Sequence, residues 1–203
     1  MITIIDYGMG NLGSIKNIIK KIGYHAEITA DKNIIANANK LILPGVGSFD
    51  KAMSNLQELD LIDIIKQKAD TGTPLLGICL GMQLLANNSE EGILSGLGII
   101  PGIVKKFEVE APLKVPHMGW NEIVYNKNCV LYKGFEIFEE TRFYFVHSYF
   151  YSCNHNEQVA ATTTYQTPFT SSVFHKNVYG VQFHPEKSHK FGMLLLKNFI
   201  EQL

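Results

Sequence analysis

Cys79 lies in a segment that could make a cysteine side chain a nucleophile. It is the central residue of Gly77-Ile78-Cys79-Leu80-Gly81, which is the cysteine form of the G-x-S-x-G nucleophile elbow. The flanking glycines permit a strained turn from a strand into a helix, and the helix dipole at that turn favours the thiolate. Because a lone cysteine is most often a buried structural residue, the interpretation as a nucleophile also needs a base.

His184 and Glu186 supply such a base and a group to orient it. They follow an alternating apolar run at residues 178–183, and Pro185 favours an extended backbone at His184. Side chains two positions apart on an extended segment point the same way, so Glu186 can reach the imidazole. An isolated His-x-Glu would suggest a solvated surface pair. Beside a cysteine elbow, it predicts a Cys79–His184–Glu186 triad for acyl transfer.

The elements that must position these residues alternate between strands and helices in the first half of the chain. Apolar runs predict the strands, and apolar residues at helical spacing predict the helices. Strands are expected at residues 1–7, 25–29, 40–43 and 75–78, and helices at residues 12–22, 49–59, 61–69 and 81–87. This alternation is typical of a parallel sheet with helices on both faces.

The second half of the chain is richer in strands. They are expected at residues 102–108, 122–125, 143–146, 159–164, 171–174 and 178–183. The short turns between them indicate that part of this section is antiparallel. A last helix is expected to start near the possible N-cap Ser188. The sequence therefore predicts one α/β domain over residues 1–203, with a mostly parallel central sheet, flanking helices and a smaller, partly antiparallel section.

Composition and charge exclude several other classes of protein. The 18 basic and 19 acidic residues give a formal net charge of −1, which provides no case for binding nucleic acid or a membrane surface. Cys79, Cys129 and Cys153 fit neither a disulfide framework nor a zinc site, so we expect no metal. Because no secretion signal or apolar run of membrane-spanning length is evident, we expect a cytoplasmic protein.

Residues 8–13 offer a competing interpretation. Gly8-Met9-Gly10-Asn11-Leu12-Gly13 matches G-x-G-x-x-G between a strand and a helix, and Asp31 follows at a suitable distance for a ribose contact. Taken alone, this is a dinucleotide-binding pattern. However, any tight turn from a strand into a helix can produce it, and the triad chemistry needs no cofactor. We therefore expect none.

At the elbow and the His-Pro-Glu segment, the sequence resembles the class I, triad-type glutamine amidotransferases. Five segments, in the same order along the chain, also resemble the glutaminase subunits of imidazole glycerol phosphate synthases. They are residues 5–12, 43–49, 116–121, 144–149 and 183–188. The resemblance covers essentially the whole chain and implies a flavodoxin-like fold.

The family pattern implies further site residues around the triad. The N–H of Leu80, the residue after the nucleophile, is expected to be one oxyanion donor, and Val46 or a neighbouring amide the other. Gln83 lies one helical turn beyond Cys79 and is expected to bind the amino-acid end of glutamine. The resemblance adds Gly47, His147, Ser148 and Tyr149 to the glutamine pocket.

The resemblance also implies a partner protein, a (βα)8-barrel cyclase that forms a heterodimer with this chain. The residues expected to face this partner are Asn11, His117, Met118, Trp120 and Lys187. The glutaminase would release ammonia, and the cyclase would use it to make imidazole glycerol phosphate and an aminoimidazole carboxamide ribotide in histidine biosynthesis.

Three alternatives remain at this stage. Residues 188–193 also resemble paralogous glutaminases that feed ammonia to another synthase, such as a surface-sugar amidotransferase. A catalytically silent subunit that only binds a partner is less compatible with the intact triad pattern. A cysteine peptidase would need an open substrate groove, which a sequence does not reveal.

Overall fold

The computed structural model describes all 203 residues, and strands from the first half of the chain form most of the parallel part of an eleven-stranded sheet. β1 (Ile2–Ile5) lies between β2 (Ala26–Thr29) and β3 (Lys40–Leu43), and all three strands run in parallel. β4 (Leu75–Ile78) follows β3 in the sheet and has the distant β13 (Val178–Val181) as its other parallel neighbour. The segments before Cys79 and before His184 are therefore adjacent strands.

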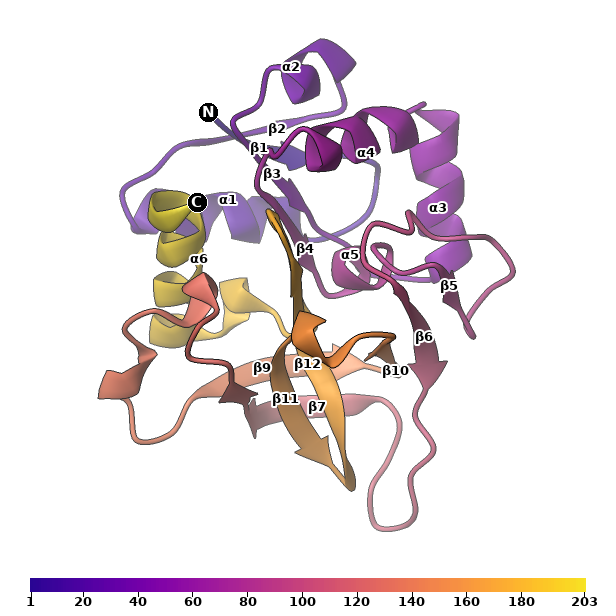
Figure 1. Cartoon of the computed structure of the whole chain (residues 1–203), viewed down its shortest axis with the longest axis vertical. Coiled ribbons are helices and arrows are strands. Elements are labelled where there is room, and N and C mark those ends of the chain that lie inside the picture. Colours follow the sequence, from indigo (N-terminus) through magenta and orange to yellow (C-terminus); the bar gives the residue numbers. More distant parts are fainter.

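Helices cover both faces of this parallel part (Figure 1). They are α1 (Leu12–Lys21), α2 (Lys32–Ala36), α3 (Phe49–Glu58), α4 (Ile62–Asp70), α5 (Leu80–Gln83) and α6 (His189–Gln202). Alternate strand residues point to opposite faces. Ile4 and Ile42 accordingly join a buried cluster with α1 and α6, whereas Leu41 and Leu43 join a second cluster with α2, α3 and α4.

The antiparallel part of the sheet begins beyond β13. In order, the sheet continues through β12 (Thr167–His175), β10 (Tyr149–Cys153), β6 (Gly102–Lys106) and β5 (Asn88–Ser89). Of two more strands, β11 (Val159–Tyr165) pairs with β12, and β8 (Val124–Tyr125) pairs with the other edge of β11. The predicted α/β class, mostly parallel with an antiparallel section, is confirmed.

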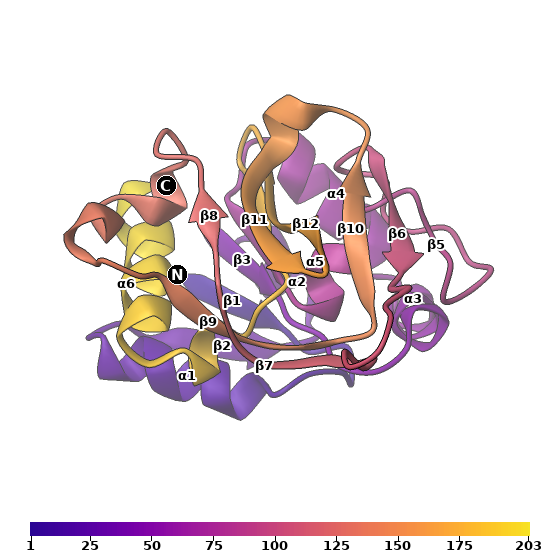
Figure 2. The same ribbon diagram turned by 90° about the horizontal axis from the view of Figure 1, so that it is seen from below.

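A separate two-stranded antiparallel sheet pairs β7 (His117–Glu122) with β9 (Arg142–His147), and Figure 2 shows both strands in the view from below. Its inner face is buried and its outer face is open to solvent. On β7, His117 is buried, whereas Met118 and Trp120 are exposed. One face of the strand is thus directed toward the core and the other toward the surface.

Short 3-10 helices lie at Val130–Tyr132, Phe135–Ile137, Asn156–Gln158 and Pro185–Lys187. The last of them carries Glu186. None of the helices combines the length and the apolar character needed to cross a bilayer.

Several elements differ from the sequence-based expectations. The helix expected at residues 81–87 ends at Gln83, because the next N–H groups bond in tighter turns, from Leu85 to Met82 and from Ala86 to Gln83. The strand expected at residues 122–125 is divided between the ends of β7 and β8. α2, β5 and β10 were not expected, since their sequences lack a clear period.

Candidate active site

Cys79 occupies a strained turn between β4 and α5. Its φ of 54° lies in a region that side chains rarely adopt. Its N–H donates to the carbonyl oxygen of Val181 on β13 at 2.8 Å, which ties the turn to the sheet. The elbow glycines allow close backbone approach, because a Cβ at Gly81 would overlap the carbonyl oxygen of Leu43 and one at Gly77 would lie 2.6 Å from that of Gly81.

His184 follows β13 and is fixed to β9 by its backbone. Its N–H donates to the carbonyl oxygen of Tyr144 at 2.9 Å, and its own carbonyl accepts the hydroxyl of Ser188 at 2.6 Å. The same hydroxyl accepts the N–H of Tyr144 at 3.0 Å. Ser188, which was expected to cap α6, makes no side-chain cap and instead fastens the segment that holds His184.

His184 and Glu186 form a buried pair, with Nδ1 of His184 2.8 Å from Oε1 of Glu186 and side chains only 3% and 2% exposed. A carboxylate accepts, so Nδ1 carries a proton and Nε2 remains for proton transfer. Burial alone would lower the pKa of His184, but the hydrogen bond to Glu186 and the negative charges of Cys79 and Glu186 outweigh burial and raise the pKa to about 10. The site therefore favours the imidazolium form of His184.

The Nε2 atom of His184 makes no hydrogen bond of ordinary geometry. The sulfur of Cys79 still contributes to raising the pKa of His184, although the two groups are not aligned for a hydrogen bond. Such alignment commonly tightens only when substrate binds.

Gln182 is a further neighbour of the nucleophile, and its side chain is fully buried. Its Nε2 donates to the sulfur of Cys79 at 3.7 Å, and its Oε1 accepts from Nε2 of Gln83 at 3.0 Å. The role of this residue was not predicted from the sequence. The signal was present, because an amide within an apolar strand run is a polar group that must find a buried partner.

A cavity of about 340 Å³ opens at Cys79. Its other lining residues are Val46, Gly47, Leu80, Gln83, Glu91, Pro116, Val146, His147, Ser148 and Tyr149. All residues that were expected in the oxyanion hole and the glutamine pocket lie around this cavity. The structure thus brings together segments from the loop after β3, the elbow, and the end of β9.

Glu91 lines the same cavity but was not expected from sequence, because nothing distinguishes Glu90-Glu91 from an exposed acidic pair. Its Oε2 accepts the N–H of Phe49 at 2.9 Å. Burial is the main cause that raises the pKa of Glu91. The hydrogen bond from Phe49 lowers this pKa, and the nearby charge of Asp50 raises it. A partly buried carboxylate here suits a cationic group in the cavity.

The N–H groups of Leu80 and Val46, the two expected oxyanion donors, are not directed toward a common position. The N–H of Leu80 donates to the carbonyl oxygen of Gly45 at 3.3 Å. In a trans peptide the N–H points away from the C=O, so the N–H of Val46 is directed away from Leu80. Bringing both N–H groups to one oxyanion would require rotation of the peptide between Gly45 and Val46.

Comparison with known proteins places this geometry in a family. The model for class-I glutamine amidotransferases matches residues 3–203. Imidazole glycerol phosphate synthase subunit HisH 2 of Methanococcus maripaludis is 57% identical over 203 residues, which cover 100% of both chains. Subunit HisH of Haemophilus influenzae is 48% identical over 202 residues, with 100% of this chain and 98% of the other covered. The chain belongs to the HisH family of class I glutamine amidotransferases.

Solved structures share the fold of this HisH-family enzyme at lower identity. PurLQS from Thermotoga maritima aligns with a TM-score of 0.75 at 16% identity, covering 99% of this chain and 97% of the other. The glutaminase domain of CTPS from Trypanosoma brucei aligns with a TM-score of 0.67 at 14% identity, covering 98% and 93%. The predicted enzyme class, a glutamine amidotransferase, is confirmed by the family.

The residues expected to face a partner differ in their exposure to solvent in this HisH-family fold. Met118 and Trp120 are 62% and 46% exposed on the outer face of β7, and Lys187 is exposed with its Nζ 5.4 Å above the ring of Tyr144. Asn11 is exposed and accepts the N–H of Ser14 as the cap of α1. His117 is buried, so the expectation that its side chain faces a partner is wrong.

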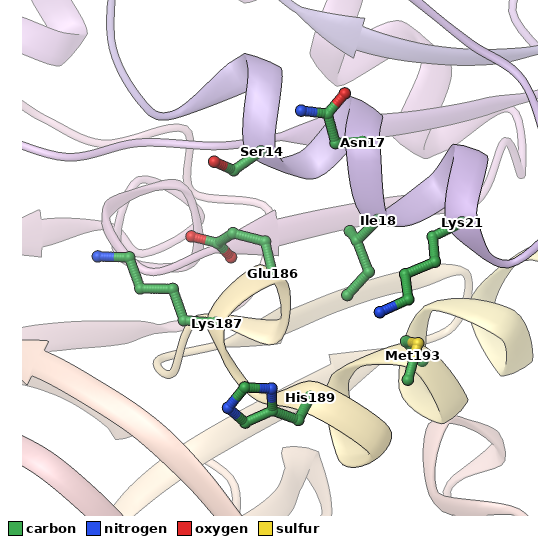
Figure 3. A pocket seen from close by; sticks show the side chains of 8 residues that line it. All are labelled: Ser14, Asn17, Ile18, Lys21, Glu186, Lys187, His189 and Met193. Atoms are coloured by element: carbon green, nitrogen blue, oxygen red, sulfur yellow. The ribbon is translucent and has the colours of Figure 1, made fainter.

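A second hollow of about 330 Å³ lies beside Glu186 (Figure 3). Side chains of α1 and of the segment that starts α6 line it, namely Ser14, Asn17, Ile18, Lys21, Lys187, His189 and Met193. It has no cysteine, serine elbow or oriented base. The acyl-transfer geometry of the HisH-family site therefore belongs to the Cys79 cavity alone.

The glycine-rich loop at residues 8–13 has a structural explanation in this fold. The side chain of Asp31, the candidate ribose ligand, accepts the N–H groups of Asn33 and Ile34 and caps α2. Gly10 has φ 103°, and a Cβ there would lie 3.3 Å from the backbone of Gly45. The loop thus packs tightly against the segment that contains Val46.

Proposed function

We propose that this chain hydrolyses glutamine to glutamate and ammonia and supplies the ammonia to a (βα)8-barrel cyclase subunit of an imidazole glycerol phosphate synthase. The observation that carries the proposal is the strained Cys79 elbow beside the buried His184–Glu186 pair. The end-to-end similarity to HisH subunits supports the assignment of the partner reaction.

The chemistry follows from the protonation states of the triad. The Cys79 thiolate attacks the side-chain carbonyl carbon of glutamine, and the carbonyl electrons move to oxygen. When the oxyanion collapses, the C–N bond breaks and the imidazolium of His184 gives its Nε2 proton to the departing ammonia. Water then attacks the thioester with His184 as base, which releases glutamate and restores the thiolate. Glu186 keeps the imidazole in the required tautomer throughout.

We assign the amino-acid end of glutamine to the Gln83 and Glu91 side of the cavity. Both Nε2 protons of Gln83 are engaged, one by Tyr149 and one by Gln182, which leaves its Oε1 as an acceptor. That oxygen and the Glu91 carboxylate are suited to an α-ammonium group. The backbone around Gly47, Ser148 and Tyr149 supplies the opposite wall.

Oxyanion stabilisation in this proposal involves the N–H groups of Leu80 and Val46. Leu80 would exchange the carbonyl oxygen of Gly45 for the substrate oxyanion, and the 45–46 peptide would rotate to present the Val46 N–H. Gly45 and Gly47 flank that peptide bond and Val46, and Gly47 already has φ 117°, so the segment tolerates unusual backbone angles. One such donor contributes about 3–4 kcal/mol to transition-state binding.

The outer face of β7 is the surface that we assign to the cyclase. Met118 and Trp120 are large exposed apolar side chains close to the cavity mouth, where Pro116 and Val146 line the opening. We include the exposed Lys187 and Asn11 in this proposed surface. Aromatic side chains and Met are typical of the centres of protein interfaces. Ammonia released at Cys79 would then need only a short protected path into the partner.

The test measures glutamate release from glutamine by this chain, alone and mixed with the cyclase of the same organism and the cyclase's acceptor ligand. Strong stimulation by the cyclase is expected. Cys153→Ala serves as a matched cysteine control and should behave as wild type. Absence of stimulation, despite labelling of Cys79 by an electrophilic glutamine analogue, would reject the cyclase as partner and favour another acceptor, such as a surface sugar synthase.

A further inference from the structure

His117 on β7 and His147 on β9 form a buried pair beside the glutamine cavity. They are direct partners in the register of the small sheet, and Nδ1 of His117 lies 2.9 Å from Nε2 of His147. Nδ1 of His147 lies 2.7 Å from the carbonyl oxygen of Tyr149. At the other end, Nδ2 of Asn121 lies 3.2 Å from Nε2 of His117. The triad chemistry uses neither imidazole.

The position of each proton in this row of hydrogen bonds follows from one group that can only accept. The carbonyl of Tyr149 can only accept, so Nδ1 of His147 carries a proton and its Nε2 accepts from Nδ1–H of His117. Nε2 of His117 then accepts from the amide of Asn121, whose nitrogen also donates to the carbonyl oxygen of Thr164 at 3.0 Å. Every donor meets an acceptor when both rings are neutral Nδ1–H tautomers.

Aromatic side chains enclose both rings. The His117 ring lies 4.2 Å from that of Tyr165 and 4.9 Å from that of Phe145, and the His147 ring lies 5.2 Å from that of Phe107. Burial lowers the pKa of His117 to about 4 and is the main cause that lowers the pKa of His147 to about 3. Both rings are therefore neutral at pH 7, as the hydrogen-bond pattern requires.

The row of hydrogen bonds continues from Tyr149 to the nucleophile. The same carbonyl oxygen accepts Nε2 of Gln83 at 3.1 Å, so it lies between His147 and Gln83. Gln83 also donates to Oε1 of Gln182, whose Nε2 reaches the sulfur of Cys79 at 3.7 Å. One connected set of hydrogen bonds thus runs from β7 through the wall of the glutamine cavity to the reactive sulfur.

We propose that His117 and His147 are positioning residues for glutamine binding. Their directed hydrogen bonds hold the carbonyl of Tyr149 where it fixes the amide of Gln83, and this leaves the Oε1 of Gln83 available to the substrate. The inference rests on the proposed glutaminase function of the cavity. It also gives the buried His117 a role inside the molecule, in place of the contact with a partner that its sequence context indicated.

The test compares His147→Leu with His147→Asn in the complex with the cyclase. Leucine removes both ring nitrogens, whereas the Nδ2 of asparagine stands at the position of Nδ1 and can still donate to Tyr149. His147→Leu should raise the KM for glutamine about fivefold, as expected for one lost hydrogen bond, with kcat changed less than about twofold. His147→Asn should recover most of that loss, and His117→Leu should resemble His147→Leu.

Phe150→Leu is the matched packing control, because Phe150 contacts Phe107 and Phe169 of the aromatic enclosure but neither imidazole. It should lower the melting temperature and leave KM unchanged. In a complex whose wild type releases glutamate, an unchanged KM in His147→Leu would overturn the proposal, as would equal losses in the Asn and Leu variants. A wild-type complex that releases no glutamate would instead overturn the proposed function.

A spectroscopic measurement tests the same inference without turnover. The ¹⁵N chemical shifts of the two imidazoles in the wild-type protein at pH 7 should identify Nδ1–H tautomers in both rings. An Nε2–H tautomer or an imidazolium at either residue would contradict the assigned direction of the hydrogen bonds and with it the proposal.

Discussion

Cys79 and His184 gain their suitability for acyl transfer from different local causes. The elbow places the sulfur at a backbone angle that clears it from the strand, whereas His184 is set by its hydrogen bond to Glu186 and by the nearby sulfur. Gln182 adds a neutral donor to the sulfur. These contacts hold the nucleophile and its base in place without a metal-ligand cluster nearby.

Replacement of the nucleophile separates the two half-reactions of the proposed synthase. Cys79→Ala should abolish glutamine hydrolysis, because no other cysteine lines the cavity. Synthesis by the cyclase from added ammonia should continue, since the acceptor chemistry belongs to the partner. Both rates can be measured in the same reconstituted complex. Retained glutamine turnover would contradict the assignment of Cys79, and lost ammonia-dependent synthesis would mean that this chain also builds the acceptor site.

The raised pKa of His184 predicts a dependence of stability on pH. Its pKa is about 10 in the folded protein and ordinarily 6.5, so the protonated ring stabilises the fold. That contribution is complete below about pH 6.5 and is lost as the pH rises through about 10. Cys79→Ala removes one cause of the raised pKa. Urea unfolding at pH 7 and pH 10 should therefore show a larger loss of stability in wild type than in the variant, and equal losses would contradict the proposed coupling.

The sequence indicated the residues of the proposed triad but not their neighbours, for a physical reason. Nucleophile elbows and His-x-Glu pairs are local patterns, because the turn and the extended segment impose fixed spacings. Gln182 and Glu91 contribute through contacts with distant segments, at Gln83 and at Phe49 respectively. Likewise, nothing local indicates that His117 points inward while its neighbours on β7 point outward.

At the scale of elements, the elbow depends on how closely β3, β4 and α5 approach one another. Gly81 is the tightest point, since any side chain there would meet the carbonyl of Leu43 on β3. By contrast, Gly13 in α1 has open space around its Cβ position and an ordinary φ. Close packing therefore requires a glycine at position 81 but not at position 13, although both glycines belong to motifs that the sequence singles out.

These surroundings predict that replacement by alanine has opposite effects on stability at the two glycines. Gly81→Ala should destabilise the protein by about 3 kcal/mol or more, because the clash is with rigid backbone. Gly13→Ala should stabilise it by about 0.5–1 kcal/mol, because alanine restricts the unfolded chain and favours the helix. Urea titration followed by circular dichroism measures both changes. A Gly81→Ala protein as stable as wild type would show that the elbow can move away from β3.

The elements that sequence predicted best were those with a clear apolar period. The strands around residues 2–5, 40–43, 75–78 and 178–181 lie within the expected ranges because they are buried on both faces. β7 was not expected as a strand, since its motif mixes polar, aromatic and glycine residues. Its conformation comes from pairing with β9, which is a tertiary interaction.

At the scale of the whole molecule, the Cys79 cavity and the proposed docking surface share one side. The cavity is lined by Val146 on β9, and the exposed Met118 pairs with Val146 across the small sheet. Trp120 stacks on His189 at the start of α6, with ring centroids 5.4 Å apart. A partner seated on this side would cover the cavity mouth.

The proposed docking surface can be tested by removing its large side chains. Trp120→Ala and Met118→Ala should each weaken binding of the cyclase by about tenfold or more, because truncating a buried aromatic or apolar anchor costs about 2 kcal/mol. Ile137→Ala, which removes another exposed apolar side chain on the 3-10 helix Phe135–Ile137, should leave affinity unchanged. Calorimetric titration measures the three affinities, and wild-type binding by both β7 variants would place the interface elsewhere.

The pairing of β4 with β13 also determines when the reactive centre can exist. Leu75 lies opposite Val178, so the strand that leads to Cys79 acquires its last neighbour from the end of the chain. During synthesis the cysteine leaves the ribosome long before His184 has been made, and non-local pairing of this kind forms late. A polypeptide that terminates early therefore carries an ordinary thiol and releases no ammonia. Completion of translation is itself the condition for reactivity.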